Sequence, residues 1–315
     1  MNASFEIIES QAGQRLDKFL SEQCETSRAQ VQKWIKLGGV TVNDKLTGVP
    51  HYLLRTGDHV NAASIAQPEA VPDTAQKRPE ALHPVVIAEE PEYLVIEKPA
   101  GLLAHPTELH EKHTLADWIR ERYPECAAIG DKPDERPGIV HRLDKDASGL
   151  MVITRTQTMF EHLKRQFMRH EIYKEYYALV HDVPPLEAGT IDFPIMRSTQ
   201  EARMSARPIS QGGKPAVTEY ELMERYTNAT LVRVTPKTGR THQIRVHFFA
   251  LGYPLVGDPL YFNKKDKRKL DTALGRLFLH ATKLRFTNLA DETVEYESGL
   301  PEELKNFLKT LKVKH

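Results

Sequence analysis

The sequence is poor in cysteine and has no long apolar run. Its 315 residues include two cysteines, Cys24 and Cys126, which lie far apart and outside any CxxC or Cys/His spacing. This usage indicates neither a disulfide framework nor a zinc site, and it favours a reducing compartment. The first ten residues carry acids where a signal peptide has bases followed by an apolar core, and no apolar run approaches membrane-spanning length. We therefore expect a soluble cytoplasmic protein that does not associate with a membrane.

The chain also lacks net charge and phosphate-cradling loops. Its 43 Lys and Arg residues offset 43 Asp and Glu residues, whereas proteins that bind nucleic acid are often basic overall. Basic runs occur at residues 264–269 and in the C-terminal tail, and such runs are most often solvated surface. Loops of the GxGxxG or GxxxxGK kind are absent from the sequence, so no nucleotide cofactor is indicated. We expect the protein to work without a cofactor.

Composition and proline placement indicate two domains. Hydrophobic residues make up 40% of the chain and charged residues 27%, which is ordinary for a globular protein of this length. Between residues 61 and 84, four prolines stand among alanines and charged residues without apolar periodicity. This composition predicts an extended linker. We place a small domain at residues 1–66, the linker at 67–83 and a larger domain at 84–315.

The N-terminal domain is predicted to contain two helices followed by strands. Residues 14–20 form the first helix. The second begins at Ser27, whose hydroxyl can cap the helix while Gln30 completes a capping box. Two glycines then end this helix before a strand at residues 40–42. The result is a small α/β unit.

In the larger domain, strand-like segments outnumber helical ones. Two helices are predicted, at residues 158–169 and at residues 241–251, the latter with Thr241 as N-cap and Gly252 as its stop. Strand runs broken by few helices, without regular βαβ alternation, indicate an α+β fold with a largely antiparallel sheet. The predicted strands are residues 85–87, 93–96, 150–153, 177–180, 216–220 and 230–234.

Four stretches of the larger domain place polar residues at the ends of apolar elements, a position that commonly lines a cleft. They are Lys98-Pro99-Ala100-Gly101, His141-Arg142-Leu143-Asp144, Lys174-Glu175-Tyr176 and residues 239–245. The second is the most informative because Asp144 stands among cations between two apolar runs. Cations favour the ionised form of an acid and burial disfavours it. Taken alone, this cluster is equally compatible with a surface ion-pair network.

The sequences of these stretches, and their order along the chain, resemble the motifs of the RluA-type pseudouridine synthases. The family signature is similar to His-Arg-Leu-Asp followed by a short polar stretch, Ser-Gly and an apolar strand, as at residues 141–153. The N-terminal domain resembles the S4 RNA-binding domain, and together the two resemblances point to the ribosomal large-subunit synthases C and D. They imply an isomerase that converts specific uridines of RNA to pseudouridine, with 23S ribosomal RNA as the first expectation and transfer RNA as the alternative.

The resemblance implies roles for three residues. Asp144 falls on the family's catalytic aspartate, which is needed to break the uridine N-glycosidic bond and to rejoin the base through carbon 5. Attack on the sugar and removal of a sugar proton both remain open for this carboxylate, and both require its ionised form. Arg245 matches the basic residue that pairs with the acid through directed donors. Tyr176 matches the active-site tyrosine, whose ring can stack on uracil.

Further residues are expected to contact RNA. A uridine in folded RNA must leave its stack before it can react, and Arg142 is the expected wedge, with a salt bridge to Asp146 as the alternative. Other backbone contacts are expected from His141, Lys98, Arg240 and the basic run at 264–269. The S4 resemblance implies an RNA-binding face made of Arg15, Ser27, Arg28, Lys33 and Lys36.

Two other functions fit parts of the sequence. The 14 histidines suggest a metal-dependent hydrolase, but His242 and His247 are five residues apart, so they point away from each other on a helix and on a strand. We expect no metal site. A ribosome-assembly factor that keeps the synthase fold without turnover is the second alternative, and the intact set of Asp144, Tyr176 and Arg245 disfavours it. No obligate protein partner is indicated.

Overall fold

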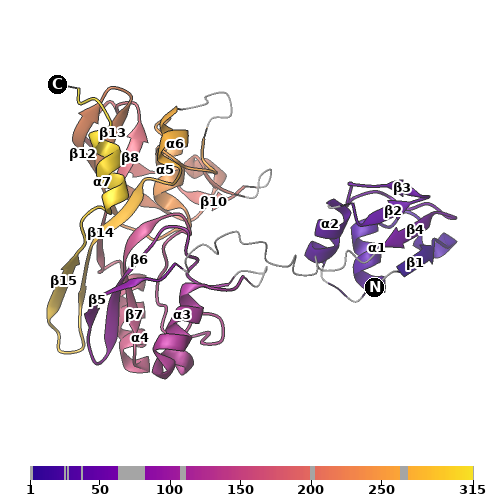
Figure 1. The fold of residues 1–315 in the computed structure, drawn as a ribbon, viewed down its shortest axis with the longest axis horizontal. Coiled ribbons are helices and arrows are strands. Elements are labelled where there is room, and N and C mark those ends of the chain that lie inside the picture. Colours follow the sequence, from indigo (N-terminus) through magenta and orange to yellow (C-terminus); the bar gives the residue numbers. More distant parts are fainter. Residues whose placement is uncertain are drawn as a thin grey trace, which may run out of the picture. The chain divides into compact units, whose positions relative to one another are not determined.

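The computed structural model describes residues 3–24, 26, 28–36, 38–62, 82–106, 111–198, 203–262 and 269–314. Its contacts divide the chain into two units, Met1–Arg78 and Pro79–His315, both drawn in Figure 1. The predicted linker at 67–83 falls almost wholly outside the described residues, as does the basic run up to residue 268. Within the described ranges, no helix has the length and apolar character needed to cross a membrane.

The N-terminal unit packs two helices against a four-stranded sheet of order β1-β4-β2-β3, in which every pairing is antiparallel. Leu16, Phe19 and Leu20 are buried on the first helix and meet Val31 and Ile35 of the second, because i, i+3 and i+4 positions share one face. This arrangement confirms the predicted small α/β unit. Its elements are β1 (Ala3–Glu6), η1 (Glu9–Gln11), α1 (Leu16–Gln23), α2 (Arg28–Lys36), β2 (Val40–Val42), β3 (Lys45–Leu46) and β4 (His59–Ala62).

A nine-stranded sheet organises the larger unit. Most of its strands are labelled in Figure 1. The strand order is β5-β6-β7-β14-β8-β13-β12-β9, and β15 pairs with β14 beside this path. Pairing is antiparallel throughout except between β7 and β14, which confirms the predicted α+β fold with a largely antiparallel sheet. The strands are β5 (Val85–Glu89), β6 (Tyr93–Lys98), β7 (Ser148–Thr154), β8 (Tyr173–His181), β9 (Ala188–Asp192), β12 (Val217–Tyr226), β13 (Ala229–Pro236), β14 (Leu279–Thr287) and β15 (Thr293–Glu297).

Short helices and one small hairpin complete this unit. The helix predicted at residues 158–169 is present as α4, which Thr156 caps by accepting a hydrogen bond from the Met159 amide at 3.2 Å. The remaining elements are α3 (Leu115–Arg122), η2 (Pro124–Ala128), α4 (Gln157–Met168), β10 (Ile195–Arg197), β11 (Met204–Ala206), η3 (Ile209–Gln211), α5 (Gln243–Ala250), α6 (Lys269–Leu274) and α7 (Glu302–Lys309).

The predicted N-cap of the fifth helix is wrong. Helix α5 begins at Gln243, and its N-cap is His242, whose φ is 56°. Thr241 cannot cap because the preceding turn is closed by the Gln243 side chain, which accepts hydrogen bonds from Thr238 Oγ1 and from the Arg240 amide. The helix therefore starts later than the sequence predicts, after a left-handed residue.

The parallel pairing in the middle of the sheet requires a glycine. Gly149 on β7 has a φ of 114°, and a Cβ at this position would lie 2.3 Å from the carbonyl oxygen of Ala281 on β14. A side chain there would push apart two strands that pair at this point. Strand β7 is buried along its whole length. The loop that carries Asp144 leads directly into this strand, so the core of the sheet fixes one end of that loop.

Candidate active site

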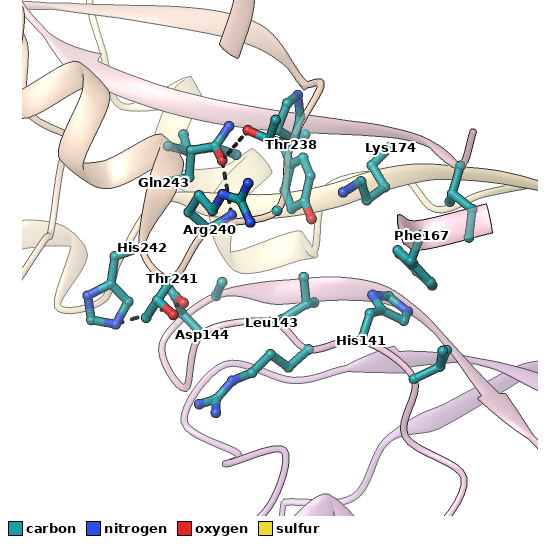
Figure 2. Close-up of a pocket in the computed structure, with 18 of the residues that line it drawn as sticks. His141, Leu143, Asp144, Phe167, Lys174, Thr238, Arg240, Thr241, His242 and Gln243 are labelled. Atoms are coloured by element: carbon teal, nitrogen blue, oxygen red, sulfur yellow. Dashed lines mark hydrogen bonds and ion pairs between the residues drawn. The ribbon is translucent and has the colours of Figure 1, made fainter. Parts of the chain in front are cut away.

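A pocket of about 620 Å³ opens in the larger unit. It is bordered by the loop before β7, the C-terminal end of α4, the start of β8 and the turn between β13 and α5. Figure 2 shows side chains from these separate segments directed toward one space. Three of the four polar stretches singled out in the sequence meet here, namely residues 141–144, 174–176 and 239–245.

Asp144 lies on the pocket wall and is held by Arg245. Arg245 Nη1 donates a hydrogen bond to Asp144 Oδ2 at 3.0 Å, and the two side chains are 4% and 18% exposed respectively. His242 Nε2 lies 3.9 Å from the other carboxylate oxygen. The structure thus brings residues 144 and 245 together, and it leaves part of the carboxylate accessible from the pocket.

Arg245 is held in turn by a second acid, Asp258, which the sequence analysis missed. Arg245 donates from Nε at 2.7 Å and from Nη2 at 2.8 Å to the two oxygens of Asp258, a paired geometry that fixes the guanidinium plane. Asp258 also accepts the backbone amides of Leu260 and Tyr261. Burial opposes the charged guanidinium, but Asp258 and then Asp144 raise the pKa of Arg245 above its ordinary value. Arg245 is therefore a permanent cation with a fixed direction.

A hydrogen-bonded turn sets the position of Arg245 at the start of α5. Thr238 Oγ1 donates to Gln243 Oε1 at 2.7 Å, and the Arg240 amide donates to the same oxygen at 3.0 Å, as the dashed lines of Figure 2 show. The Gln243 amide nitrogen donates to strand β12. The left-handed φ of His242 costs a non-glycine residue about 1 kcal/mol, so these bonds hold a strained turn in place.

Tyr176 lies on β8 and is 9% exposed. Burial, followed by the negative charge of Asp144, raises the pKa of the Tyr176 phenol, so its hydroxyl keeps its proton at neutral pH. Lys174 lies on the same face of the strand, because side chains alternate along a strand, and both residues line the pocket. The pocket thus presents a ring, a hydroxyl and an ammonium from one strand.

His141 forms part of the pocket wall as a neutral ring. It stacks on Phe167 with a centroid distance of 4.8 Å, and its Nε2 accepts the Val152 amide at 3.0 Å. Burial, followed by the charge of Lys174, lowers the pKa of His141 to about 3. His141 therefore offers no cation to a phosphate, and a contact of its ring with RNA stays a prediction.

The predicted RNA contact of Lys98 is wrong. The side chain is fully buried, and Nζ donates to the carbonyl oxygens of Pro99, Leu102 and Lys145 at 2.8, 2.9 and 3.2 Å. Burial lowers the pKa of Lys98 to about 7, with the charge of Asp144 acting in the opposite direction. Since the ammonium is enclosed, it cannot reach RNA, and instead it ties β6 to the residue that follows Asp144.

Arg142 and Arg240 both line the pocket. Arg142 is exposed, and its Nη1 lies 3.0 Å from His105 Nε2. Among the described residues, it forms no ion pair with Asp146. Arg240 is half-buried and its Nε donates to the Pro215 carbonyl at 3.0 Å. Both guanidinium groups therefore keep donors for a substrate.

In the N-terminal unit, Asp17 gathers two of the residues predicted to bind RNA. Arg15 and Arg28 each donate two hydrogen bonds to its carboxylate, and Gln32 adds a third partner at 2.7 Å. Burial acts against the charged carboxylate, but these hydrogen bonds hold the pKa of Asp17 well below its usual range. Asp17 is fully buried while the two arginines stay 44% and 48% exposed. Ser27 and the side chains of Lys33 and Lys36 lie outside the described residues.

The histidines near the pocket have separate partners. His242 Nδ1 bonds the Tyr261 hydroxyl, whereas His247 bonds Thr218 and the Phe193 carbonyl. In the part of the chain that the structure describes, no group of three or more His, Cys, Asp or Glu side chains is placed to hold a metal ion.

This fold and site define a class of protein. The family model for RNA pseudouridylate synthases matches residues 92–250, and the model for the S4 domain matches residues 14–60. The chain belongs to the RNA pseudouridylate synthase family, and it is an isomerase that acts on RNA. The resemblance predicted from the sequence motifs is thereby confirmed.

The similarity to individual relatives covers nearly the whole chain. The sequence is 36% identical over 306 residues to the uncharacterized RNA pseudouridine synthase YlyB of Bacillus subtilis, which covers 96% of each chain. It is 37% identical over 318 residues to ribosomal large subunit pseudouridine synthase D of Yersinia pestis, covering 97% of this chain and 93% of that relative. Among solved structures, human RNA Pseudouridylate Synthase Domain Containing 1 aligns with a TM-score of 0.58 at 26% identity, over 74% of this chain and 90% of that chain.

Proposed function

We propose that this enzyme converts one or more uridines of large-subunit ribosomal RNA to pseudouridine in the cytoplasm, with Asp144 as the catalytic group. The observation that carries the proposal is the 3.0 Å hydrogen bond from Arg245 to Asp144 inside a pocket that also holds Tyr176. The similarity to a relative named for the ribosomal large subunit supports the choice of RNA.

The charge of the pocket supports an RNA substrate. Among its described lining residues, Asp144 is the only acid. RNA carries a negative charge at every phosphate, so a locally basic cleft attracts it even when the whole chain has no net charge. The basic lining residues are Arg136, Arg142, Lys164, Lys174, Lys237, Arg240 and Arg245.

The proposed reaction follows from the groups that face the pocket. The target uridine leaves its stack, at a cost of a few kcal/mol, and exposed Arg142 occupies the space that the base vacates. Asp144, oriented by the hydrogen bond from Arg245, acts on the ribose by attack or by removal of a proton. The bond from ribose C1′ to uracil N1 breaks, the base turns, and C5 forms the new bond. C5 then loses its hydrogen and N1 gains one, so the product is an isomer.

Tyr176 supports the base during this rotation. Its ring borders the pocket beside Asp144 and can stack on the detached uracil. The raised pKa of Tyr176 keeps the phenol protonated. Its hydroxyl can therefore donate a hydrogen bond to a uracil carbonyl, and it does not act as the general base in place of Asp144.

The test is to incubate the protein with an unmodified large-subunit RNA transcript and to map pseudouridine by carbodiimide treatment and reverse transcription. We expect a small number of modified uridines, and none with Asp144→Asn. The matched control is Asp146→Asn, which changes a nearby acid that does not line this pocket and should keep activity. Product formed by Asp144→Asn would contradict the role of Asp144. Product on transfer RNA alone would replace the proposed substrate, and binding without product would make the protein an RNA-binding factor.

A further inference from the structure

Lys174 places its ammonium between the two walls of the pocket. Its Nζ lies 5.7 Å from the ring centroid of Phe167 on α4. On the other side, a Cβ built on Gly239 would lie 3.7 Å from the same nitrogen. Figure 2 shows the side chain reaching from β8 into the space between Phe167 and the turn that carries Arg240. The ammonium is therefore fixed inside the pocket and not on its outer rim.

This ammonium has no counter-ion among the described residues. The other lysines of the pocket each have an acidic partner, since Lys164 pairs with Asp131 at 2.7 Å and Lys237 pairs with Glu219 at 2.8 Å. The Lys174 ammonium forms neither a hydrogen bond nor an ion pair within the described part of the chain, and its contact is the face of the Phe167 ring. Burial lowers the pKa of Lys174 to about 8, which still leaves the group protonated at pH 7.

A partly buried charge without a partner is costly unless a ligand supplies one. Ions removed from water are paired in folded proteins, because desolvation penalises the charged form. The Lys174 ammonium has three N–H donors in a pocket built for a polyanion. An anionic group of the substrate would offset the cost and use these donors.

We propose that Lys174 binds a phosphate group of the RNA backbone beside the target uridine. This inference rests on the proposed function. Tyr176 lies two residues along the same strand face, about 6.6 Å away at the Cα positions, so the ring and the ammonium are spaced to receive neighbouring parts of one nucleotide. The carbonyl oxygens of uracil are neutral and leave the charge of Lys174 uncompensated, whereas a phosphodiester neutralises it.

The first test measures RNA affinity at several salt concentrations. An Asp144→Asn background prevents turnover, and the probe is the large-subunit RNA transcript that carries the mapped uridine. We expect Lys174→Met to weaken binding about tenfold and to reduce the salt slope by about one counter-ion. Lys174→Arg should retain both. The control is Lys283→Met on neighbouring strand β14, because Lys283 is already paired with Glu295 and Glu297, and it should change neither quantity.

The second test identifies the ligand of Lys174. A neutral methylphosphonate is placed at each phosphate around the target uridine. At one of these positions, the methylphosphonate should weaken binding to the Asp144→Asn protein. The same substitution should leave binding to the protein that carries both Asp144→Asn and Lys174→Met unchanged. Sensitivity to a methylphosphonate that is the same in both proteins at every position would overturn the proposal, and the uracil would then be the ligand. An unchanged affinity and salt slope in Lys174→Met would overturn it as well.

A pH series provides a reading that does not depend on the methionine variant. Because a bound anion raises the pKa of Lys174 above its free value of about 8, RNA affinity should fall as the pH rises from 8 to 9.5, and Lys174→Arg should abolish this fall. The titratable and charged groups around residue 174 are the same in both proteins, so the difference reports on that residue. The described titratable and charged groups that line the pocket with Lys174 are His105, Arg136, His141, Arg142, Asp144, Lys164, His170, Tyr176, Lys237, Arg240, His242 and Arg245. Pseudouridine formation by the unsubstituted protein tests the proposed function separately.

Discussion

At the scale of single residues, the site is a chain of three charges. Asp258 orients Arg245, and Arg245 orients Asp144. Only the last of these acids faces the pocket, since Asp258 is 4% exposed and does not line it. The direction of the Asp144 carboxylate therefore depends on a second acid that lies outside the pocket.

Asp258→Asn should lower kcat by about 10- to 100-fold. An asparagine keeps one acceptor for Arg245 but loses the charge, and a hydrogen bond to a charged group contributes about 1.5–3 kcal/mol, which converts to such a factor. The measurement is single-turnover pseudouridine formation together with RNA affinity. We expect kcat to fall while the affinity for RNA stays within about twofold.

Thermal unfolding of the same variant is the control, because Asp258 also accepts two backbone amides. A fall in RNA affinity equal to the fall in kcat, or an unchanged kcat in a folded variant, would contradict a positioning role for Asp258.

Of the three linked charges, Asp144 and Arg245 were predicted from the sequence and Asp258 was missed. Polar residues at the ends of apolar elements singled out the stretches that contain Asp144, Tyr176 and Arg245, and the family resemblance then implied the role of each residue. Asp258 follows the apolar pair Leu255-Val256 in the same way, so the same pattern was present and was not used. Lys98 also fitted the pattern, but the prediction failed because the pattern does not reveal whether nearby carbonyl oxygens enclose the ammonium.

At the scale of elements, the N-terminal helices are joined by a buried carboxylate. Asp17 of α1 accepts from Arg28 and Gln32 of α2. The same carboxylate aligns two of the arginines predicted to contact RNA. Packing of the two helices and presentation of their basic side chains thus depend on one residue.

Asp17→Asn should destabilise the N-terminal unit by about 2 kcal/mol at pH 7, since several hydrogen bonds to a charged group are weakened. The folded pKa of Asp17 lies below its ordinary value, so its contribution is complete above the unfolded value of about 3.9 and declines as the pH falls below it. The difference between the two proteins should therefore shrink in acid. Trp34 reports unfolding of this unit in a Trp118→Phe background.

A difference in stability that stays constant from pH 7 to pH 2 would argue against this account of Asp17. The substitution Arg28→Lys offers a further comparison, because lysine keeps the charge and loses the paired donors. The Arg28→Lys variant should retain part of the stability that the Asp17 hydrogen bonds give the N-terminal unit.

Elements with a strong local pattern could be predicted from the sequence. The order in which the strands pair in the sheet could not. Helix α4 and strands β6, β7 and β13 follow apolar periodicity, and they were found close to their observed bounds. Strands β14 and β15 were missed. The sequence does not show that β14 inserts between β7 and β8, because strand order depends on contacts between distant segments. The start of α5 was misplaced because the amide of a side chain, and not a hydroxyl N-cap, closes the preceding turn.

At the scale of the whole molecule, the two units have separate cores. Among the described residues, the buried core of the first unit runs from Ile7 to Ala62, and the buried cores of the second unit begin at Tyr93. Separate cores allow each unit to fold without the other. The pocket lies within the second unit, and the S4-domain match lies within the first.

Removal of residues 1–78 should leave a folded enzyme that has lost selectivity. We expect modification of a short stem-loop bearing the target uridine to proceed within about threefold of the full chain. On full-length transcripts, the truncated protein should modify its uridine more slowly and add others. Pseudouridine mapping on both RNAs measures this. The same site pattern and rate on long RNA would show that the N-terminal unit does not choose the target.

The position of β14 in the middle of the sheet also has a consequence during synthesis. The chain emerges at about 5–20 residues per second, and β14 (Leu279–Thr287) appears about one hundred residues after β8, although it pairs between β7 and β8 in the sheet. The S4 domain needs nothing beyond Ala62 for its sheet. A nascent chain therefore holds the whole sheet of its S4 domain before β14 is made, whereas the sheet that carries the pocket cannot close until β14, which contributes Leu279 to the pocket, has been synthesised.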